Sequence, residues 1–497
     1  MTDFDAAADA LTIARLAGLS TIELDRVRRA EAAKLGIRPE TLDSQVRAAR
    51  RAASGPEPGD DRPPEFSDEA LALRFTARHA DDLRYVAAWG RWHRWTGSVW
   101  RPDDTLHVFD LARAICREAA AQCPDPHAAP RIASAQTVAA VERLARADRR
   151  HAATSDQWDF DPWLLNTPGG IVDLRTGERR EHRREDYVTK ITAVAPGGDY
   201  PLWRAFLSRI TNGGGDLHDF LQRAAGHALT GITREHALFF GYGTGANGKG
   251  TFLNTVSGIL GAYATTAPME TFEAGQNDRH PTELAMLRGS RLVTATETEE
   301  GRRWAESRIK ALTGGDPISA RFMRQDFFSF VPQFKLFITG NHKPGLRGVD
   351  EAIRRRLHLI PFEVTIPPAE RDGALADKLR AEWPGILAWM IEGCSHWQRI
   401  GLAPPQSVRD ATDRYLETED AIGIWLAERC WAGGQYGDTL MNLFSSWKDW
   451  AETAGEYVGQ RKRFSQALEA RGFVLGRQGG TGRTSFVGVA VRAEGAL

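Results

Sequence analysis

The sequence predicts a multidomain α/β protein, and three observations lead to that prediction. The chain has 497 residues, whereas one domain usually takes about 150. Between residues 235 and 362, strand-like runs (ALFF, RLVTAT, FKLFITG and LHLIPF) alternate with helical ones, as in an α/β sheet. Two stretches rich in Pro, residues 54–66 and 401–406, interrupt the regular patterns and mark boundaries.

The composition of the chain indicates its cellular compartment but not its binding partner. The chain is 42% hydrophobic and 26% charged and contains no long apolar run, so we expect no membrane span. Its start is acidic, unlike a secretory signal, which favours a cytoplasmic protein. Four scattered cysteines without CxxC spacing argue against a disulfide framework and a structural zinc. With 64 basic against 65 acidic residues, the net charge says nothing about nucleic acid.

The segment FFGYGTGANGKGTF predicts a nucleotide site. A short buried-type strand precedes a Gly-rich loop, and a helical pattern follows it. Backbone N–H groups at such a helix start point at phosphates, and Lys249 adds a positive charge. We therefore expect ATP to bind at Gly243, Thr244, Gly245, Ala246, Asn247, Gly248, Lys249, Gly250, Thr251 and Phe252. The alternative is a Gly-rich turn that binds no ligand.

Magnesium ligands are predicted on both sides of this loop. The usual phosphate loop ends in a hydroxyl residue, where this chain has Gly250, so we expect the adjacent Thr251 to hold Mg²⁺ directly or through water. The strand RLVTAT runs into Glu297 and Glu299, which alternate onto one face; one would hold the metal and the other polarise the attacking water. The alternative is an acidic strand end on the surface.

Two further polar features flank predicted buried strands: one follows a strand, and the other precedes a strand. Asn341 ends FKLFITGN, where it would sense a γ-phosphate or its water, although Asn is also a common turn former. Arg354, Arg355 and Arg356 stand just before LHLIPF. Three successive guanidinium groups cannot all be buried, so at least one reaches solvent or the ATP of a neighbouring subunit.

The ordered motifs GTGANGKGTF, RLVTATETEE, IKALTGGDPISARFMRQDFFSF, FKLFITGNHKP and RRRLHLIPF resemble superfamily 3 helicases of the phage, plasmid and poxvirus primase-associated branch. The resemblance implies an AAA+-like P-loop ATPase core that assembles into a ring, commonly a homo-hexamer, with ATP between subunits and DNA in the channel. Lys249 then matches the first motif, Glu297 and Glu299 the second, and Asn341 the sensor. Arg355 and Arg356 match the paired arginines, one of which would be the arginine finger, while Arg354 departs from the expected aromatic residue.

The resemblance also orders the domains and places the DNA contacts. Between two strand-like runs, Arg324 would lie at a hairpin tip in the pore, and Lys310 and Arg321 would follow the phosphates of the DNA strand. Alternatively, Arg321 pairs with Asp316 or Asp326. The last segment resembles a winged helix, with Arg461, Lys462 and Arg463 at a helix start, for duplex DNA or for protein docking. We expect a helical segment (1–53), a linker (54–66), a mixed α/β domain (67–200), a helical collar (201–232), the ATPase domain (233–395) and a winged-helix-like DNA-binding domain (396–497).

The sequence thus favours an ATP- and Mg²⁺-dependent, ring-forming replicative helicase of phage or plasmid type, which translocates on single-stranded DNA and unwinds forked DNA. We expect a separate primase partner, because too few residues precede the mixed domain for a primase fold, and a host bacterial cytoplasm if a phage encodes the chain. Two alternatives remain: a P-loop nucleotide kinase, and an ATP-dependent origin-binding or scaffold protein that does not unwind DNA.

Overall fold

The computed structural model describes residues 3–53, 63–274, 282–296, 301–322, 326–346, 349–477 and 483–492. Most of the predicted linker therefore lies outside the described residues. The chain divides into two compact units, 1–78 with 108–148, and 79–107 with 149–497. In the described ranges, no helix combines the length and the apolar character that crossing a bilayer requires.

The first unit is helical. At the N-terminal end, Ser20 and Glu23 form a capping box that starts the second helix, and Leu16, Ala32, Leu42 and Val46 form a small core. The predicted helical character of residues 1–53 is confirmed. The helices are α1 (Asp3–Ala17), α2 (Thr21–Lys34), α3 (Pro39–Ala53), α4 (Asp68–His79), α5 (His107–Gln122), α6 (Ala129–Ile132) and α7 (Ala135–Ala147).

Two small antiparallel sheets begin the second unit. The first contains β1 (Leu83–Val86), β2 (Arg91–Trp95) and β3 (Trp100–Pro102), and the second contains β4 (Leu164–Thr167), β5 (Gly170–Asp173) and β6 (Arg179–Arg180). The segment LLNTPGGIVDLRTGE forms a hairpin between β4 and β5, with its turn at Pro168 and Gly169. The tryptophans of the first sheet fill a core in which Trp100 and Trp158 lie edge to face.

A five-stranded parallel sheet forms the centre of the second unit. Its strands are β7 (Leu238–Tyr242), β8 (Ala264–Thr266), β9 (Leu292–Thr296), β12 (Lys335–Gly340) and β13 (Leu357–Pro361), in the order β13-β7-β12-β9-β8. The four strands expected from the sequence are all present. The fifth, β8, was missed because its three residues, Ala-Thr-Thr, carry no apolar pattern.

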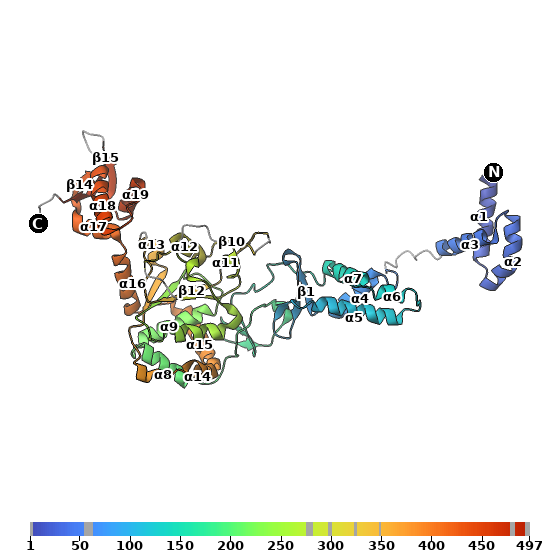
Figure 1. Cartoon of the computed structure of the whole chain (residues 1–497), viewed down its shortest axis with the longest axis horizontal. Coiled ribbons are helices and arrows are strands. Elements are labelled where there is room, and N and C mark those ends of the chain that lie inside the picture. The colour runs from blue at the N-terminus through green and yellow to red at the C-terminus, as the bar shows by residue number, and fades with distance from the viewer. Residues whose placement is uncertain are drawn as a thin grey trace. The chain divides into compact units, whose positions relative to one another are not determined.

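Helices cover both faces of this sheet (Figure 1). Alternate residues of one strand contribute to different cores: Phe239 belongs to one hydrophobic cluster, Leu238 and Phe240 to the other. The first cluster includes α8 (Pro201–Ile210), α9 (Gly215–Ala228), α10 (Lys249–Leu260), α14 (Leu375–Ala381) and α15 (Trp383–Ile400). The second includes α11 (Thr282–Ala285), α12 (Glu306–Gly314), α13 (Glu351–Arg354) and α16 (Gln406–Thr418).

Two further parts of the second unit match local expectations. The predicted hairpin is present as β10 (Ile318–Ala320) and β11 (Phe328–Phe330), paired antiparallel. The last segment contains α17 (Ala421–Arg429), β14 (Cys430–Thr439), α18 (Leu440–Ala454), α19 (Arg461–Ala470), β15 (Val474–Arg477) and β16 (Thr484–Val491). Phe464 and Leu468 are buried on the core side of α19.

Candidate nucleotide site

The carboxyl edge of the parallel sheet gathers the predicted nucleotide residues. The loop that begins at Gly243 follows β7, and Asn341 follows β12. The register pairs Tyr242 with Gly340, so these two strands end at the same level. Because β12 lies between β7 and β9, Asn341 follows a strand that neighbours both β7 and β9. The edge where parallel strands end is the usual place for ligands in open α/β sheets.

The loop between β7 and α10 has a conformation that only particular residues permit. Gly243 has φ 156° and Gly248 has φ 86°. A Cβ atom at Gly243 would lie 2.3 Å from the Phe362 carbonyl oxygen, and one at Gly248 would lie 2.4 Å from Ile210 Cγ2. The glycines therefore let this loop approach neighbouring backbone and α8 closely, and successive N–H groups in such a turn can surround an anion.

Lys249 begins α10 and is largely buried, with 7% of its surface exposed. Its Nζ donates to the Gly243 carbonyl oxygen (2.6 Å) and to Asn341 Oδ1 (3.3 Å). Burial lowers the pKa of Lys249, since the ammonium group has left water without gaining a carboxylate partner among the described residues. An incoming phosphate would supply the missing negative charge. The structure thus brings Lys249 and Asn341 together across 92 positions of sequence.

The other loop residues divide into exposed and structural ones. Thr244, Ala246 and Gly250 are exposed. Asn247 is buried, and its Nδ2 donates to the Phe362 carbonyl oxygen (3.0 Å), which fixes the loop to the segment after β13. Phe252 is in the core, and its N–H donates to Gly248, so both are engaged within the protein.

The first turn of α10 has room for metal ligands. A Cβ at Gly250 would meet no atom within 4 Å, and Thr251 is half-buried beside it. Glu297 and Glu299 lie outside the described residues. Within the ranges that the structure describes, no group of three or more His, Cys, Asp and Glu side chains could hold a metal ion.

The structure distinguishes the three successive arginines. Arg354 Nη1 pairs with Asp413 Oδ1 of α16 (3.0 Å). Arg356 is buried; its Nε donates to Thr313 Oγ1 (3.1 Å) and its Nη1 to the Ala352 carbonyl oxygen (2.7 Å), and burial lowers its pKa. The Arg355 side chain is exposed and makes no hydrogen bond or ion pair with any described residue, while its backbone N–H donates to the Glu351 carbonyl oxygen (3.1 Å). All three precede β13 and therefore lie at the amino edge of the sheet, opposite the loop.

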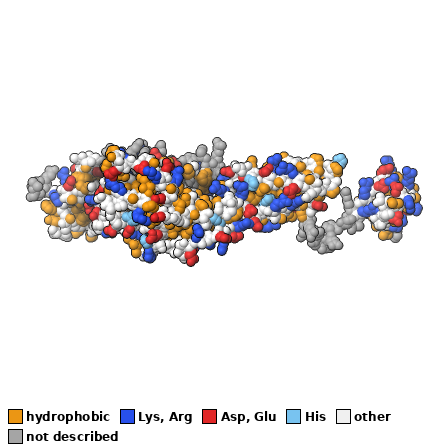
Figure 2. All heavy atoms as spheres, turned by 90° about the horizontal axis from the view of Figure 1, so that it is seen from below, with side chains coloured by type: hydrophobic (Ala, Val, Ile, Leu, Met, Phe, Trp, Pro, Cys, Tyr) orange, Lys and Arg blue, Asp and Glu red, His pale blue; other side chains and the backbone are white. Residues whose placement is uncertain are grey.

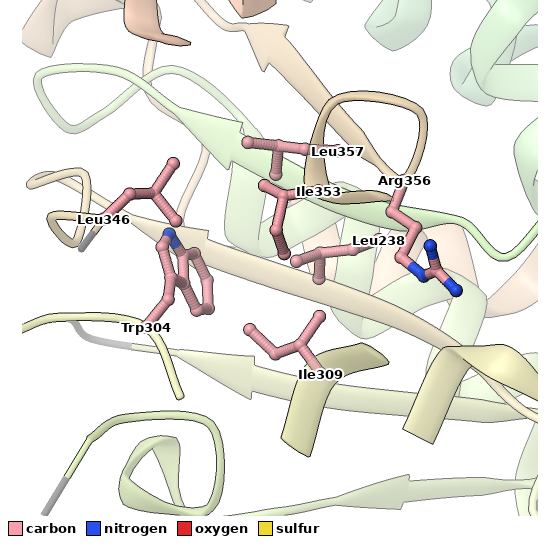
Figure 3. Close-up of a pocket in the computed structure, with 7 residues that line it drawn as sticks. All are labelled: Leu238, Trp304, Ile309, Leu346, Ile353, Arg356 and Leu357. Carbon is pink, nitrogen blue, oxygen red and sulfur yellow. The ribbon is translucent and has the colours of Figure 1, made fainter. Parts of the chain in front are cut away.

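A small cavity lies beside Arg356 (Figure 3). Its volume is about 10 Å³, and apolar side chains of β7, α12 and α13 contribute to its wall. Figure 3 shows the Arg356 guanidinium directed away from the apolar side chains. A cavity of this size is at the lower limit for one water molecule, so it is a packing gap and not a ligand site.

Two buried cations that the sequence did not reveal position the sheet. Arg291, just before β9, donates to the carbonyl oxygens of Leu229 (2.6 Å) and Leu164 (2.7 Å). Lys335, the first residue of β12, donates to the Thr230 carbonyl oxygen, and burial lowers its pKa well below the usual range. Both hold the end of α9 against the amino ends of the strands that lead to the site. A charged residue directly before a buried apolar run was the available signal.

The predicted DNA contacts are placed as follows. Lys310 forms an ion pair with Asp350. Within the described part of the hairpin, Arg321 forms no ion pair with Asp316 or Asp326; its guanidinium lies 4.8 Å from the Phe327 ring centroid. Arg324 lies outside the described residues. Three exposed basic residues begin α19: Arg461, Lys462 and Arg463.

Comparisons with known proteins agree with this organisation. Residues 72–212 match the family described as D5 N terminal like, and residues 241–356 match a family of unknown function, DUF5906. The chain is 24% identical over 333 residues to "Putative helicase L207/L206" of Acanthamoeba polyphaga mimivirus, covering 61% of this chain and 34% of that protein. It is 25% identical over 314 residues to "Putative helicase 022R" of Frog virus 3, covering 58% and 31%. The chain spans about a third of the length of these curated relatives.

Among solved structures, the chain is similar to the C-terminal region of NrS-1, with a TM-score of 0.45, 8% identity, and coverage of 85% of this chain and 99% of that one. The chain is thus similar, over residues 72–212, to the family described as D5 N terminal like, and to viral proteins named as putative helicases.

Proposed function

We propose that this chain is an ATP-driven DNA helicase that forms a ring, commonly a hexamer, translocates on single-stranded DNA and unwinds forked DNA. The main supporting observation is that Lys249 and Asn341 meet at the carboxyl edge of a parallel sheet, at the end of a strand, loop and helix. We interpret this unit as an AAA+-like P-loop core.

The site residues suit a magnesium-bound triphosphate. The glycines of the loop bring backbone N–H groups close, and Lys249 offers a buried cation whose charge lacks a carboxylate partner among the described residues. Thr251 would hold the metal, and Glu297 and Glu299 would hold it or orient the attacking water. Magnesium neutralises charge on the phosphates when it is bound.

The position of Arg355 favours catalysis between subunits. Leu357 pairs with Leu238 and Pro361 with Tyr242, so the strand separates Arg355 from the loop of its own chain. The four residue steps from Leu357 to Pro361, at about 3.3 Å each, make about 13 Å, and the chain from Arg355 to Leu357 adds to this distance. That distance is too great for one arginine side chain. Arg355 can therefore act on a triphosphate only if that triphosphate lies in an adjacent subunit.

The DNA-binding parts of the proposal rest on the hairpin and on the C-terminal segment. Arg321 beside Phe327 combines a cation with an exposed ring, as single-strand binding sites do. We interpret α18, α19 and the sheet β14-β16-β15 as a winged helix whose exposed Arg461, Lys462 and Arg463 contact duplex DNA. A primase on another chain would complete the replication machinery.

The proposal is tested by unwinding of a labelled fork and by DNA-stimulated ATP hydrolysis. Lys249→Ala should abolish both. Mixing Lys249→Ala with Arg355→Ala protein in equal amounts should restore activity, because about a quarter of head-to-tail interfaces then combine an intact Lys249 with an intact Arg355. Unwinding by Lys249→Ala alone would refute the mechanism, and a mixture as inactive as its parts would refute the shared site.

The same assay separates the two other functions that the sequence left open. Transfer of phosphate to a nucleoside monophosphate, without fork unwinding, would identify a kinase. Ring formation with ATP, without strand separation, would identify an assembly protein.

A further inference from the structure

The small sheet β1-β2-β3 exposes a pair of like charges. Arg94 on β2 lies directly opposite Arg101 on β3, and both side chains are exposed. Residues directly opposite in an antiparallel pair share one face, with Cβ atoms about 5 Å apart. Like charges in this arrangement destabilise a sheet. We call Arg94 and Arg101 the arginine face.

Within the described residues, no carboxylate compensates this pair. Neither the Arg94 nor the Arg101 side chain forms a hydrogen bond or an ion pair there, and both are exposed. Neighbouring acids are engaged elsewhere: Asp82 pairs with Arg184 (3.4 Å), and Asp103 Oδ1 accepts the His107 N–H (3.0 Å). The folded chain therefore retains two adjacent positive charges at a cost to its stability, which an anionic ligand would remove.

The arginine face is connected to the hairpin. The Arg288 guanidinium lies 4.6 Å from the ring centroid of Trp89 and 5.3 Å from that of Phe328. Trp89 stands two residues before β2, and Phe328 is the first residue of β11. Arg288 thus joins the sheet of the arginine face to the loop end of the hairpin β10–β11, where Phe328 pairs with Ala320.

The net charge of the whole chain does not reveal the arginine face. Over the face of the molecule in Figure 2, basic and acidic side chains are interspersed without a large field of one sign. A binding surface for a polyanion can therefore consist of a few local cations that lack acidic partners, as Arg94 and Arg101 do among the described residues.

We propose that the arginine face binds the phosphate backbone of single-stranded DNA and continues the strand path that begins at the hairpin. The inference rests on the proposed function, because it assumes that the hairpin contacts DNA. Guanidinium groups bind phosphate through paired N–H donors, and a phosphate between Arg94 and Arg101 offsets their repulsion. Such contacts carry no base preference, as a translocating protein requires.

The test compares binding of labelled oligothymidylate to full-length wild type and to the Arg94→Ala/Arg101→Ala variant over a range of salt concentrations. Losing two phosphate contacts should reduce the slope of log K against log salt by about 1.4, which corresponds to about 25-fold weaker binding at 0.1 M salt. The midpoint of thermal unfolding should stay the same or rise, because the substitution removes repulsion.

The matched control is Arg113→Ala/Arg117→Ala, which removes two exposed arginines of α5 and the same net charge. It should bind as wild type does. If wild type binds the strand and the Arg94→Ala/Arg101→Ala variant shows the same affinity and salt slope, the inference is overturned while the proposed function stands; an acidic protein partner for this face would give that result. If wild type does not bind oligothymidylate at all, both the inference and the proposed function are wrong.

Discussion

The arginine triplet gives the sharpest prediction, because three neighbouring arginines have three different environments. Arg356 is buried and makes two hydrogen bonds inside its own subunit. Arg354 forms one exposed ion pair with Asp413, and the Arg355 side chain has no partner among the described residues. Substituting each by alanine should therefore affect stability and catalysis in different proportions.

The expected magnitudes follow from these contacts. Arg356→Ala removes two hydrogen bonds from a charged donor, at about 1.5 to 3 kcal/mol each, and should lower the stability by about 3 kcal/mol or more. Arg354→Ala should cost at most about 1 kcal/mol, as exposed ion pairs do. Arg355→Ala should change stability by less than about 0.5 kcal/mol, yet lower DNA-stimulated ATP hydrolysis by about 10³-fold or more if Arg355 is the finger.

Two measurements on the same preparations check this pattern: unfolding followed by tryptophan fluorescence, and steady-state ATP hydrolysis with and without DNA. Arg356→Ala should unfold under milder conditions than wild type, whereas Arg355→Ala should unfold under the same conditions as wild type but be inactive. Arg354→Ala serves as the control that removes an equal charge from the same turn. If Arg355→Ala hydrolyses ATP at the wild-type rate, or if Arg356→Ala is as stable as wild type, the assignment from burial is wrong.

Three further predictions concern the loop and the buried cations. Thr251→Ala should raise the Mg²⁺ concentration that half-maximal ATP hydrolysis requires by about tenfold, as one lost ligand contact of about 1.4 kcal/mol would. Gly250→Ser/Thr251→Ala should restore the wild-type Mg²⁺ requirement, since the Gly250 site is open. No recovery would argue against a hydroxyl ligand here. Gly248→Ala should abolish ATP binding in a direct titration, because the new Cβ would lie 2.4 Å from a side chain of α8 at a positive φ; unchanged affinity would show that the loop adapts. The folded pKa of Lys335 lies below its unfolded value, so the unfolded state binds more protons between the two pKa values, and the free energy of unfolding should rise with pH across that alkaline window. In urea titrations, Lys335→Met should remove this rise. An equally steep rise in the variant would contradict the prediction.

Much of the candidate site was predictable from local sequence because its elements are local. The strand, the loop and the helix around Lys249 occupy one continuous segment, in which glycines, apolar spacing and one lysine each have a conformational meaning. The hairpin and four of the five parallel strands follow for the same reason. The fifth strand, β8, did not, since three residues carry too little pattern for its pairing with β9 to be visible.

The sequence by itself determined the order of the motifs, the alternation of strands and helices, and the residue types available for phosphate, metal and DNA. Only the tertiary structure decided which side chains meet. It placed Asn341 at Lys249, buried Arg356 and left Arg355 exposed, and set Arg94 beside Arg101. Local sequence records what one residue can do, but burial and strand register depend on segments far apart in the chain, whose contacts a linear pattern does not contain.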